Sequence, residues 1–350
     1  MFVSAFKASA AGAMLLMAST AFADVTLTYS EPGPNTGARS KGTEWFVNRV
    51  AELSDGAVKV DVSWGGALSS EKAAVQSIED GVVDMGTVIG VYFPQQMIAY
   101  NVADLPQDNA DAWVSMKAID ELMRTSEPVK QQLAKQNLVY IGPYTTWTVQ
   151  LGCKGRDVKS LDQIKGLKVR GVGAYGQIFR DLGATPVSLT AYETFQGLDS
   201  GLIECTQTYP YLVPAQKLDE ILTSFTMLDI GQIGAVGIFM NKDIYDGLSD
   251  TERAALDQAG AELPDAFGQI SFKENMAALD MMRAKGISVH DLSAADRQTL
   301  HDTAAKYLGE WVGNADKAGL PGQQILDQFN ALTAKYAQQV AEKGHPWGSE

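Results

Sequence analysis

The sequence has 350 residues, of which 28 are Lys or Arg and 42 are Asp or Glu, giving a formal net charge of −14. This charge argues against a nucleic-acid partner and against an anionic lipid surface, because both repel an acidic protein. Hydrophobic residues make up 45% of the chain, enough for a sizeable core, and the length suggests two lobes. An anionic ligand would have to be met by locally placed cations.

The first 23 residues have the pattern of a secretory signal peptide. Lys7 precedes an apolar stretch over residues 8–22, and Ala21-Phe22-Ala23 gives a small-x-small cleavage pattern before Asp24. A membrane anchor is the alternative, but a bilayer requires roughly 20 predominantly apolar residues and small residues interrupt this stretch. Cleavage removes Lys7 and no acid, so the charge moves from −14 to −15. We expect an exported, periplasmic protein without stable membrane insertion.

After this leader, strand and helix patterns alternate along the chain. In order, we expect a strand at 25–29, a helix at about 41–54, a strand at 58–62, a helix at 70–80 and a strand at 82–88. A second set begins near residue 139, with strands at 147–151, 167–170, 186–189 and 202–207, and residues from 250 onward are mostly helical. This order predicts an α/β fold of two compact lobes, with parallel sheets covered by helices.

Two cysteines, Cys153 and Cys205, remain in the exported chain. An oxidising compartment favours a disulfide between them, and two buried free thiols are the alternative. We expect no metal site, because the histidines His290, His301 and His345 are far from both cysteines in sequence and lack ligand spacing.

The chain contains one motif that suggests an enzyme. Residues 171–176 read Gly-Val-Gly-Ala-Tyr-Gly directly after a predicted strand, and Glu193 follows at roughly the distance of a ribose-binding acid. Export separates the protein from the soluble nicotinamide pool, however, and Arg170 immediately precedes the first glycine. A turn whose backbone N–H groups can face an anion explains the glycines better. Because hydrolase motifs are also missing from the sequence, we expect no enzyme activity and no cofactor.

Four passages, taken in order, resemble the periplasmic solute-binding proteins of tripartite ATP-independent (TRAP) transporters, the DctP-like family. They include Val60-Asp61-Val62-Ser63-Trp64-Gly65-Gly66, the segment 160–170 that ends in Arg170, the segment 183–218 and Gly237-Ile238-Phe239-Met240-Asn241-Lys242. Each passage is short, but together they cover nearly the whole chain after the leader.

The resemblance implies a type II-like periplasmic binding protein fold, in which two α/β lobes are linked by a long helix and close on a ligand. Carried onto this sequence, residues 24–147 and 234–271 form lobe one. Residues 148–233 and 272–350, with the C-terminal helices, form lobe two. The same topology places the strand of Cys153 beside the strand of Cys205, which makes their disulfide geometrically reasonable.

The resemblance also points to Arg170 as the residue that binds a ligand carboxylate. A guanidinium group is always charged and matches a carboxylate with two parallel hydrogen bonds. A salt bridge at the surface or between the lobes is the alternative role. Gln150 stands where some relatives carry a second arginine, which suggests one carboxylate contact fewer. Thr208 stands at a position where relatives often have asparagine, and it keeps a short hydrogen-bonding group in the pocket.

Aromatic residues near these positions could form the walls of the pocket. Tyr209 stands where relatives often have proline, and the other candidates are Tyr211, Trp147, Trp64 and Tyr92. Such walls suit an apolar ligand body or a cationic group held by cation–π attraction. Glu31, in the first strand-to-helix turn, could balance a ligand cation, although a solvated loop acid is the simpler interpretation.

Together these features predict a periplasmic protein that captures a small carboxylate-containing ligand, an organic acid or a zwitterion, and delivers it to TRAP membrane subunits. A solute receptor of the ABC type and a sensor protein that presents a ligand share the two-lobe plan and remain alternatives. A periplasmic oxidoreductase that uses the glycine motif is the enzyme alternative.

Overall fold

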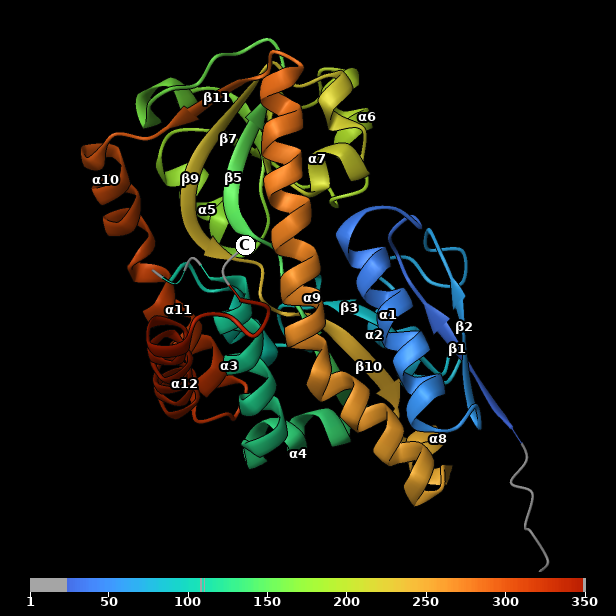
Figure 1. The fold of residues 1–350 in the computed structure, drawn as a ribbon. Helices are drawn as coiled ribbons and strands as arrows, with labels where there is room; N and C mark the ends of the chain where they lie inside the picture. The colour runs from blue at the N-terminus through green and yellow to red at the C-terminus, as the bar shows by residue number, and fades with distance from the viewer. Residues whose placement is uncertain (1–23, 108, 110, 349–350) are drawn as a thin grey trace, which may run out of the picture.

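The computed structural model describes residues 24–107, 109 and 111–348; the predicted signal peptide lies outside the described residues. The chain forms two lobes, each built around one sheet, and the helix α9 runs along both (Figure 1). The two-lobe fold with a long linking helix is therefore confirmed.

Lobe one contains a five-stranded sheet in the order β2-β1-β3-β10-β4. Its strands are β1 (Val25–Ser30), β2 (Val58–Ser63), β3 (Met85–Ile89), β4 (Leu138–Tyr144) and β10 (Val236–Asn241). Its helices are α1 (Gly37–Leu53), α2 (Ala74–Glu79), α3 (Ala112–Thr125), α4 (Glu127–Lys135) and α8 (Lys242–Gly247), with the short 3-10 helices η1 (Gly90–Tyr92) and η2 (Tyr100–Asp104).

Lobe two contains a six-stranded sheet in the order β11-β9-β5-β8-β6-β7. Its strands are β5 (Thr148–Cys153), β6 (Lys168–Arg170), β7 (Thr185–Val187), β8 (Cys205–Thr208), β9 (Ser224–Gln232) and β11 (Ser288–Asp291). Its helices are α5 (Gly173–Asp181), α6 (Thr194–Asp199), α7 (Leu212–Ala215) and α10 (Ala294–Ala304), with the 3-10 helices η3 (Leu161–Ile164) and η4 (Leu218–Glu220).

Both sheets are mixed, although the sequence pattern predicted parallel sheets. In lobe one β10 runs antiparallel to β3 and β4, and in lobe two β5 runs antiparallel to β8 and β9. The reason is that two strand-to-strand connections cross between the lobes, from β4 to β5 and from β9 to β10. A strand that arrives from the other lobe enters the sheet against the direction of its neighbours. Strand–helix alternation in the sequence does not reveal such crossings.

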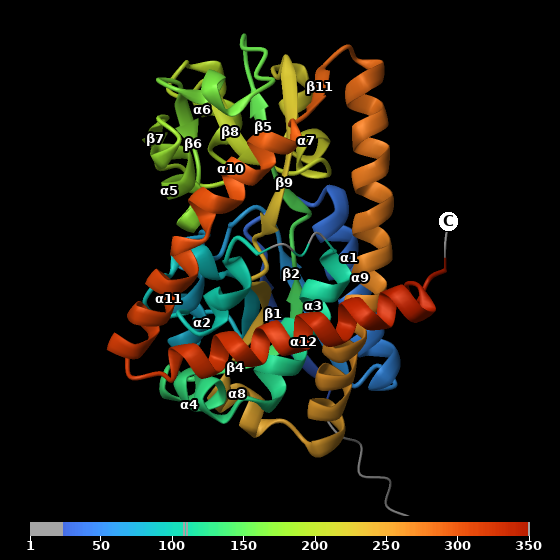
Figure 2. The same cartoon turned by 90° about the vertical axis from the view of Figure 1, so that its left-hand side faces the viewer.

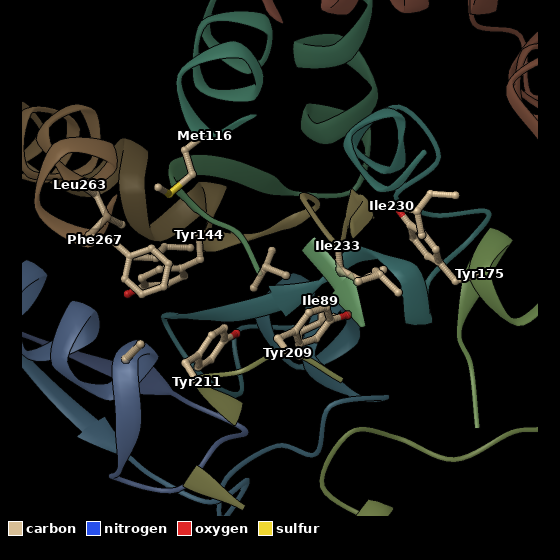
Figure 3. Close-up of a cluster of buried hydrophobic side chains, with 14 of the residues drawn as sticks. Ile89, Met116, Tyr144, Tyr175, Tyr209, Tyr211, Ile230, Ile233, Leu263 and Phe267 are labelled. Atoms are coloured by element: carbon tan, nitrogen blue, oxygen red, sulfur yellow. The ribbon is translucent and has the colours of Figure 1, made fainter. Parts of the chain in front are cut away.

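The two crossings are hydrogen bonded to each other and form the hinge. The Thr146 backbone N–H donates to the Ile233 carbonyl at 3.0 Å, and the Ile233 N–H donates to the Thr146 hydroxyl at 2.9 Å. Buried side chains from both lobes surround this region, and Figure 3 shows Ile233 close to Ile89 and Tyr209. The hinge is thus a narrow, well-packed connection rather than a loose linker.

The predicted disulfide is present in lobe two. Cys153 in β5 and Cys205 in β8 are directly opposite in register, and their sulfur atoms are 2.12 Å apart. Since Cys205 also pairs with Val169 of β6, the bond lies beside the strand that ends in Arg170. It therefore ties the crossing strand to the part of lobe two that carries the predicted ligand contact.

The C-terminal helices differ from the expected division, which assigned residues 272–350 to lobe two. Helices α11 (Lys306–Lys317) and α12 (Gly322–Lys343) pack on lobe one, where α12 lies across α3 (Figure 2). Phe329 and Tyr336 share a core cluster with Trp113, and the Trp311 indole N–H donates to the Ile98 carbonyl at 3.0 Å. The sequence pattern predicts helices here, but a helical pattern does not specify which lobe a helix covers.

Helix α9 (Asp250–Ala284) begins directly after Ser249. The Ser249 hydroxyl accepts a hydrogen bond from the Glu252 N–H and the Glu252 carboxylate accepts one from the Ser249 N–H, which is a capping box. The helix packs so closely on β4 at Gly260 that no side chain fits there. A Cβ atom at this position would lie 1.9 Å from the Ile141 carbonyl oxygen. No helix among the described residues is long and apolar enough to cross a membrane.

We predict that Gly260→Ala lowers the free energy of unfolding by about 1–3 kcal/mol or more, because the added methyl group forces α9 away from β4. Gly309→Ala is the control, since Gly309 is an exposed residue inside α11 with open space around its Cα. Alanine there favours the helix by about 0.5–1 kcal/mol. Urea denaturation measures both, and equal effects of the two substitutions would contradict the close packing.

Candidate functional site

Arg170 is the last residue of β6 and is buried, with 2% of its surface exposed. Its Nε donates to the Leu189 carbonyl at 3.0 Å, and its Nη1 donates to the Gln207 carbonyl at 3.1 Å. Its Nη2 donates to the Tyr92 hydroxyl at 3.1 Å. All three acceptors are neutral, and no ion pair joins this guanidinium to a carboxylate of the described residues. The positive charge is therefore fixed in position but not neutralised.

Tyr92 brings lobe one into contact with Arg170. It is the last residue of η1, and its hydroxyl accepts hydrogen bonds from Arg170 and from the Ala191 backbone N–H, the latter at 2.9 Å. Burial raises the pKa of the Tyr92 hydroxyl, so it stays a neutral phenol. Since Arg170 and Ala191 belong to lobe two, this single oxygen joins the two lobes across the cleft.

Glu31 forms an ion pair with Arg39 in lobe one. Its Oε1 accepts from the Arg39 guanidinium at 2.9 and 3.0 Å and from the Gly33 N–H at 2.7 Å. Its Oε2 accepts from the Thr87 hydroxyl at 2.6 Å. Glu31 is buried, not a solvated loop acid, and its charge is already balanced by Arg39. The sequence analysis missed Arg39, although its place in the first turns of the helix after Glu31 offered a signal.

Glu71 is a second buried acid in the cleft, and the sequence analysis also missed it. Only 7% of its surface is exposed, and its Oε1 has no hydrogen-bond partner among the described residues. Burial raises the pKa of its carboxyl, while Thr190, Arg39 and Arg170 act in the opposite direction. It precedes α2 in a serine-rich stretch without a recognisable motif, so only the fold reveals its position.

Tyr209 and Tyr211, which the sequence suggested as pocket walls, are both buried, each with 5% of its surface exposed. Their rings are stacked, with centroids 6.2 Å apart and planes inclined by 15°. Figure 3 shows the two side chains next to each other below Ile89 and Ile233. Tyr209 lies within the electrostatic reach of Arg170, and Tyr211 within that of Arg39 and Glu31. These rings therefore connect the surroundings of the two arginines.

Gln150 of β5 and Thr208 of β8 lie opposite each other. The Gln150 side chain is fully hydrogen bonded, whereas the Thr208 hydroxyl is not. The Gln150 amide donates to Thr148 and to Asp229, and its oxygen accepts from the Leu228 and Asp229 N–H groups at 2.6 and 3.1 Å. It thereby holds an irregular part of β9. The Thr208 hydroxyl is buried and has no partner among the described residues.

Among the described residues, no hydrogen bond or ring contact joins Trp147 or Trp64 to Arg170. Trp64 follows directly after β2 and is half-buried. Trp147 packs against Phe272 of α9 and lines a cavity of about 960 Å³ behind the hinge. Trp113 and Trp347 line the same cavity, and its walls contain no Lys or Arg among the described residues. This cavity therefore offers no guanidinium or ammonium group to a carboxylate.

The glycine motif serves close packing between β6 and α5. A Cβ atom on Gly171 would lie 2.7 Å from the Cα atom of Gly176, so side chains at these positions would push the helix away from the strand. Gly173 has a positive φ of 55° where α5 begins. The Val172 N–H is occupied by the Gln207 side chain at 2.9 Å.

Residues 31–313 match the family described as bacterial extracellular solute-binding protein, family 7 (DctP). The chain belongs to this family. It is 26% identical over 284 residues to the C4-dicarboxylate-binding periplasmic protein DctP of Rhodobacter capsulatus, covering 77% of this chain and 84% of that protein. The resemblance stated from the sequence is therefore confirmed.

Solved structures of TRAP solute-binding proteins share the fold of this DctP-family protein. One, from Rhodoferax ferrireducens with copurified benzoate, has a TM-score of 0.81 at 22% identity and covers 90% of this chain and 99% of its own. Another, from Bordetella bronchiseptica with bound mandelate, has a TM-score of 0.80 at 20% identity and covers 89% and 99%. At these identities the likeness concerns the fold alone, and the family and its structural neighbours consist of solute-binding proteins.

We predict that Gln150→Leu lowers the free energy of unfolding by about 2–4 kcal/mol, because it leaves two N–H groups of β9 without an acceptor. Gln196→Leu, on the exposed face of α6, is the control and should change stability by less than about 0.5 kcal/mol. Chemical denaturation gives both values. Wild-type stability combined with lost ligand binding would show instead that Gln150 contacts the ligand.

Proposed function

We propose that this protein is the periplasmic receptor of a TRAP transporter, that it captures a small monocarboxylate by closing its lobes, and that it delivers the ligand to the membrane subunits. The observation that carries the proposal is the buried Arg170 guanidinium, which is held by neutral acceptors and has no carboxylate partner among the described residues. A buried charge is costly unless it is paired, and an anionic ligand supplies the missing partner.

The geometry of Arg170 favours a carboxylate over other anions. A guanidinium has five N–H groups, and the described contacts use one on each of its three nitrogens. One N–H therefore remains on Nη1 and one on Nη2. Two such donors suit the paired oxygens of a carboxylate, which form short, charge-assisted hydrogen bonds. The carbonyls of Leu189 and Gln207 prevent the side chain from turning away.

The surroundings of Arg170 support one carboxylate rather than two. The position of a second family arginine is occupied by Gln150, whose amide is already bonded within β5 and β9. Arg39 is paired with Glu31, so it does not offer a free charge to a second carboxylate. The same pair gives no support for a ligand cation at Glu31. The stacked Tyr209 and Tyr211 suit an apolar or aromatic ligand body.

The relatives support a carboxylate ligand by analogy. The Rhodobacter capsulatus protein is named for C4-dicarboxylates, and the two structural neighbours contain benzoate and mandelate. The monocarboxylates among these agree with an Arg170 guanidinium that no carboxylate of the described residues pairs with. Family membership favours TRAP membrane subunits as the partner over an ABC-type transporter or a sensor kinase.

We predict that a monocarboxylate ligand raises the melting temperature of the purified protein and that Arg170→Gln abolishes this shift. Ligand in hundredfold excess over Kd stabilises the native state by about 2.7 kcal/mol. Loss of one partner of a buried charge pair costs about 2–5 kcal/mol of binding. Arg180→Gln is the matched control, because Arg180 is exposed on α5. A shift that survives in Arg170→Gln would place the carboxylate elsewhere.

We also predict that Tyr92→Phe opens the ligand-free protein, because it removes the oxygen that accepts from Arg170 and Ala191 across the cleft. Small-angle X-ray scattering should show a larger radius of gyration. Tyr245→Phe, which removes a hydroxyl that binds Asp257 away from the cleft, should leave the scattering unchanged. Identical curves for wild type and Tyr92→Phe would show that other contacts hold the lobes together.

A further inference from the structure

Glu71 is the buried acid near Arg170 whose charge is not balanced by a direct ion pair among the described residues. The acid Glu31 is paired with Arg39, and Arg170 is bonded to carbonyls and to Tyr92. Glu71 nevertheless lies within electrostatic reach of both arginines, and its Oε1 is buried without a partner. A carboxyl group in this position is costly when ionised and lacks a hydrogen-bond acceptor when protonated.

The same short segment of lobe two contacts all three central side chains. The Leu189 carbonyl accepts from Arg170, the Thr190 side chain interacts with Glu71, and the Ala191 N–H donates to Tyr92. A ligand bound at Arg170 would therefore lie beside the segment 189–191, which Glu71 also contacts. This arrangement places a ligand carboxylate and a protein carboxyl near each other.

We propose that Glu71 takes up a proton when a carboxylate binds to Arg170, and that the protonated Oε1 then donates a hydrogen bond to an oxygen of the ligand. This inference rests on the proposed function, since it requires an anionic ligand at Arg170. A buffer acid or hydronium ion supplies the proton, so its bond to that proton breaks as the O–H bond of Glu71 forms, and nothing is oxidised or reduced. The receptor would thus capture its ligand together with one proton.

Electrostatics gives the direction of this coupling. In this structure, burial raises the pKa of the Glu71 carboxyl, and attraction from Arg39 and Arg170 partly offsets that rise. A bound carboxylate cancels the attraction from Arg170 and adds a like charge, and both changes raise the pKa further. Arg39 cannot compensate because it stays paired with Glu31. Binding should therefore be strongest below the pKa of Glu71 in the free protein and weaken as pH rises toward its pKa in the complex.

The other groups that face Glu71 do not produce the same effect. Burial raises the pKa of the Tyr92 hydroxyl, which stays neutral. The backbone N–H of Thr190 lowers the pKa of Glu193, an exposed acid that therefore stays ionised near neutral pH. Arginine side chains such as Arg39 and Arg170 do not exchange their charge at physiological pH. Glu71 is the group whose protonation the ligand can change.

The test is isothermal titration calorimetry of the wild-type protein with benzoate, mandelate and pyruvate in buffers of different ionisation enthalpy. We expect uptake of up to one proton per bound ligand, and an affinity that falls by up to tenfold per pH unit across the titration of Glu71. Glu71→Gln, which carries a permanently neutral donor, should bind without proton uptake and without this pH dependence. Glu193→Gln should retain both.

The outcomes separate this inference from the proposed function. Binding of a monocarboxylate without proton uptake by the wild-type protein would overturn the role of Glu71 and leave the receptor function standing. Proton uptake that persists in Glu71→Gln would also overturn it. If none of the three acids binds to the wild-type protein, the monocarboxylate function fails, and the inference fails with it. If Glu71→Gln does not fold, the absence of proton uptake by the wild-type protein still overturns the inference.

Discussion

A buried arginine that no carboxylate of the described residues pairs with is the constraint on which the site between the lobes depends. Lobe two holds the Arg170 guanidinium with the carbonyls of Leu189 and Gln207, and the disulfide beside β6 fixes the strand from which it projects. Neutral acceptors orient a charge but do not neutralise it, so the desolvation penalty persists until an anion arrives. Lobe one contributes Tyr92 to the same group, which makes the charge a point of contact between the lobes.

The acids of the cleft divide into one that is balanced and one that is not. Glu31 and Arg39 form a closed network with Thr87 and the backbone of Gly33, so they shape lobe one without offering a charge to the ligand. Glu71 keeps a buried oxygen without a partner among the described residues, within electrostatic reach of Arg170. A monocarboxylate at Arg170, with a proton on Glu71, would leave the cleft electrically neutral. Closure of the lobes over a neutral site avoids the cost of burying a net charge.

The sequence predicted the features that short local patterns encode. The resemblance to the DctP-like family singled out Arg170 at the end of a predicted strand. Export and family topology predicted the Cys153–Cys205 disulfide, and chain length with strand–helix alternation predicted the two lobes. Features that depend on which distant surfaces meet were not predictable in this way. The mixed sheets result from two crossings of the chain, α12 covers lobe one although it follows lobe two in sequence, and Gln150 bonds to β9 instead of facing the cleft. Glu71 becomes notable only once Thr190 and Arg170 lie beside it.

The most direct measurement is a crystal structure of the protein with a bound monocarboxylate such as benzoate. Our account predicts that both carboxylate oxygens lie within hydrogen-bond distance of Nη1 and Nη2 of Arg170, with the ligand body against Tyr209 and Tyr211. A ligand found instead in the aromatic cavity behind the hinge, lined by Trp113, Trp147 and Trp347, with Arg170 still bonded only to Tyr92 and the two carbonyls, would contradict it.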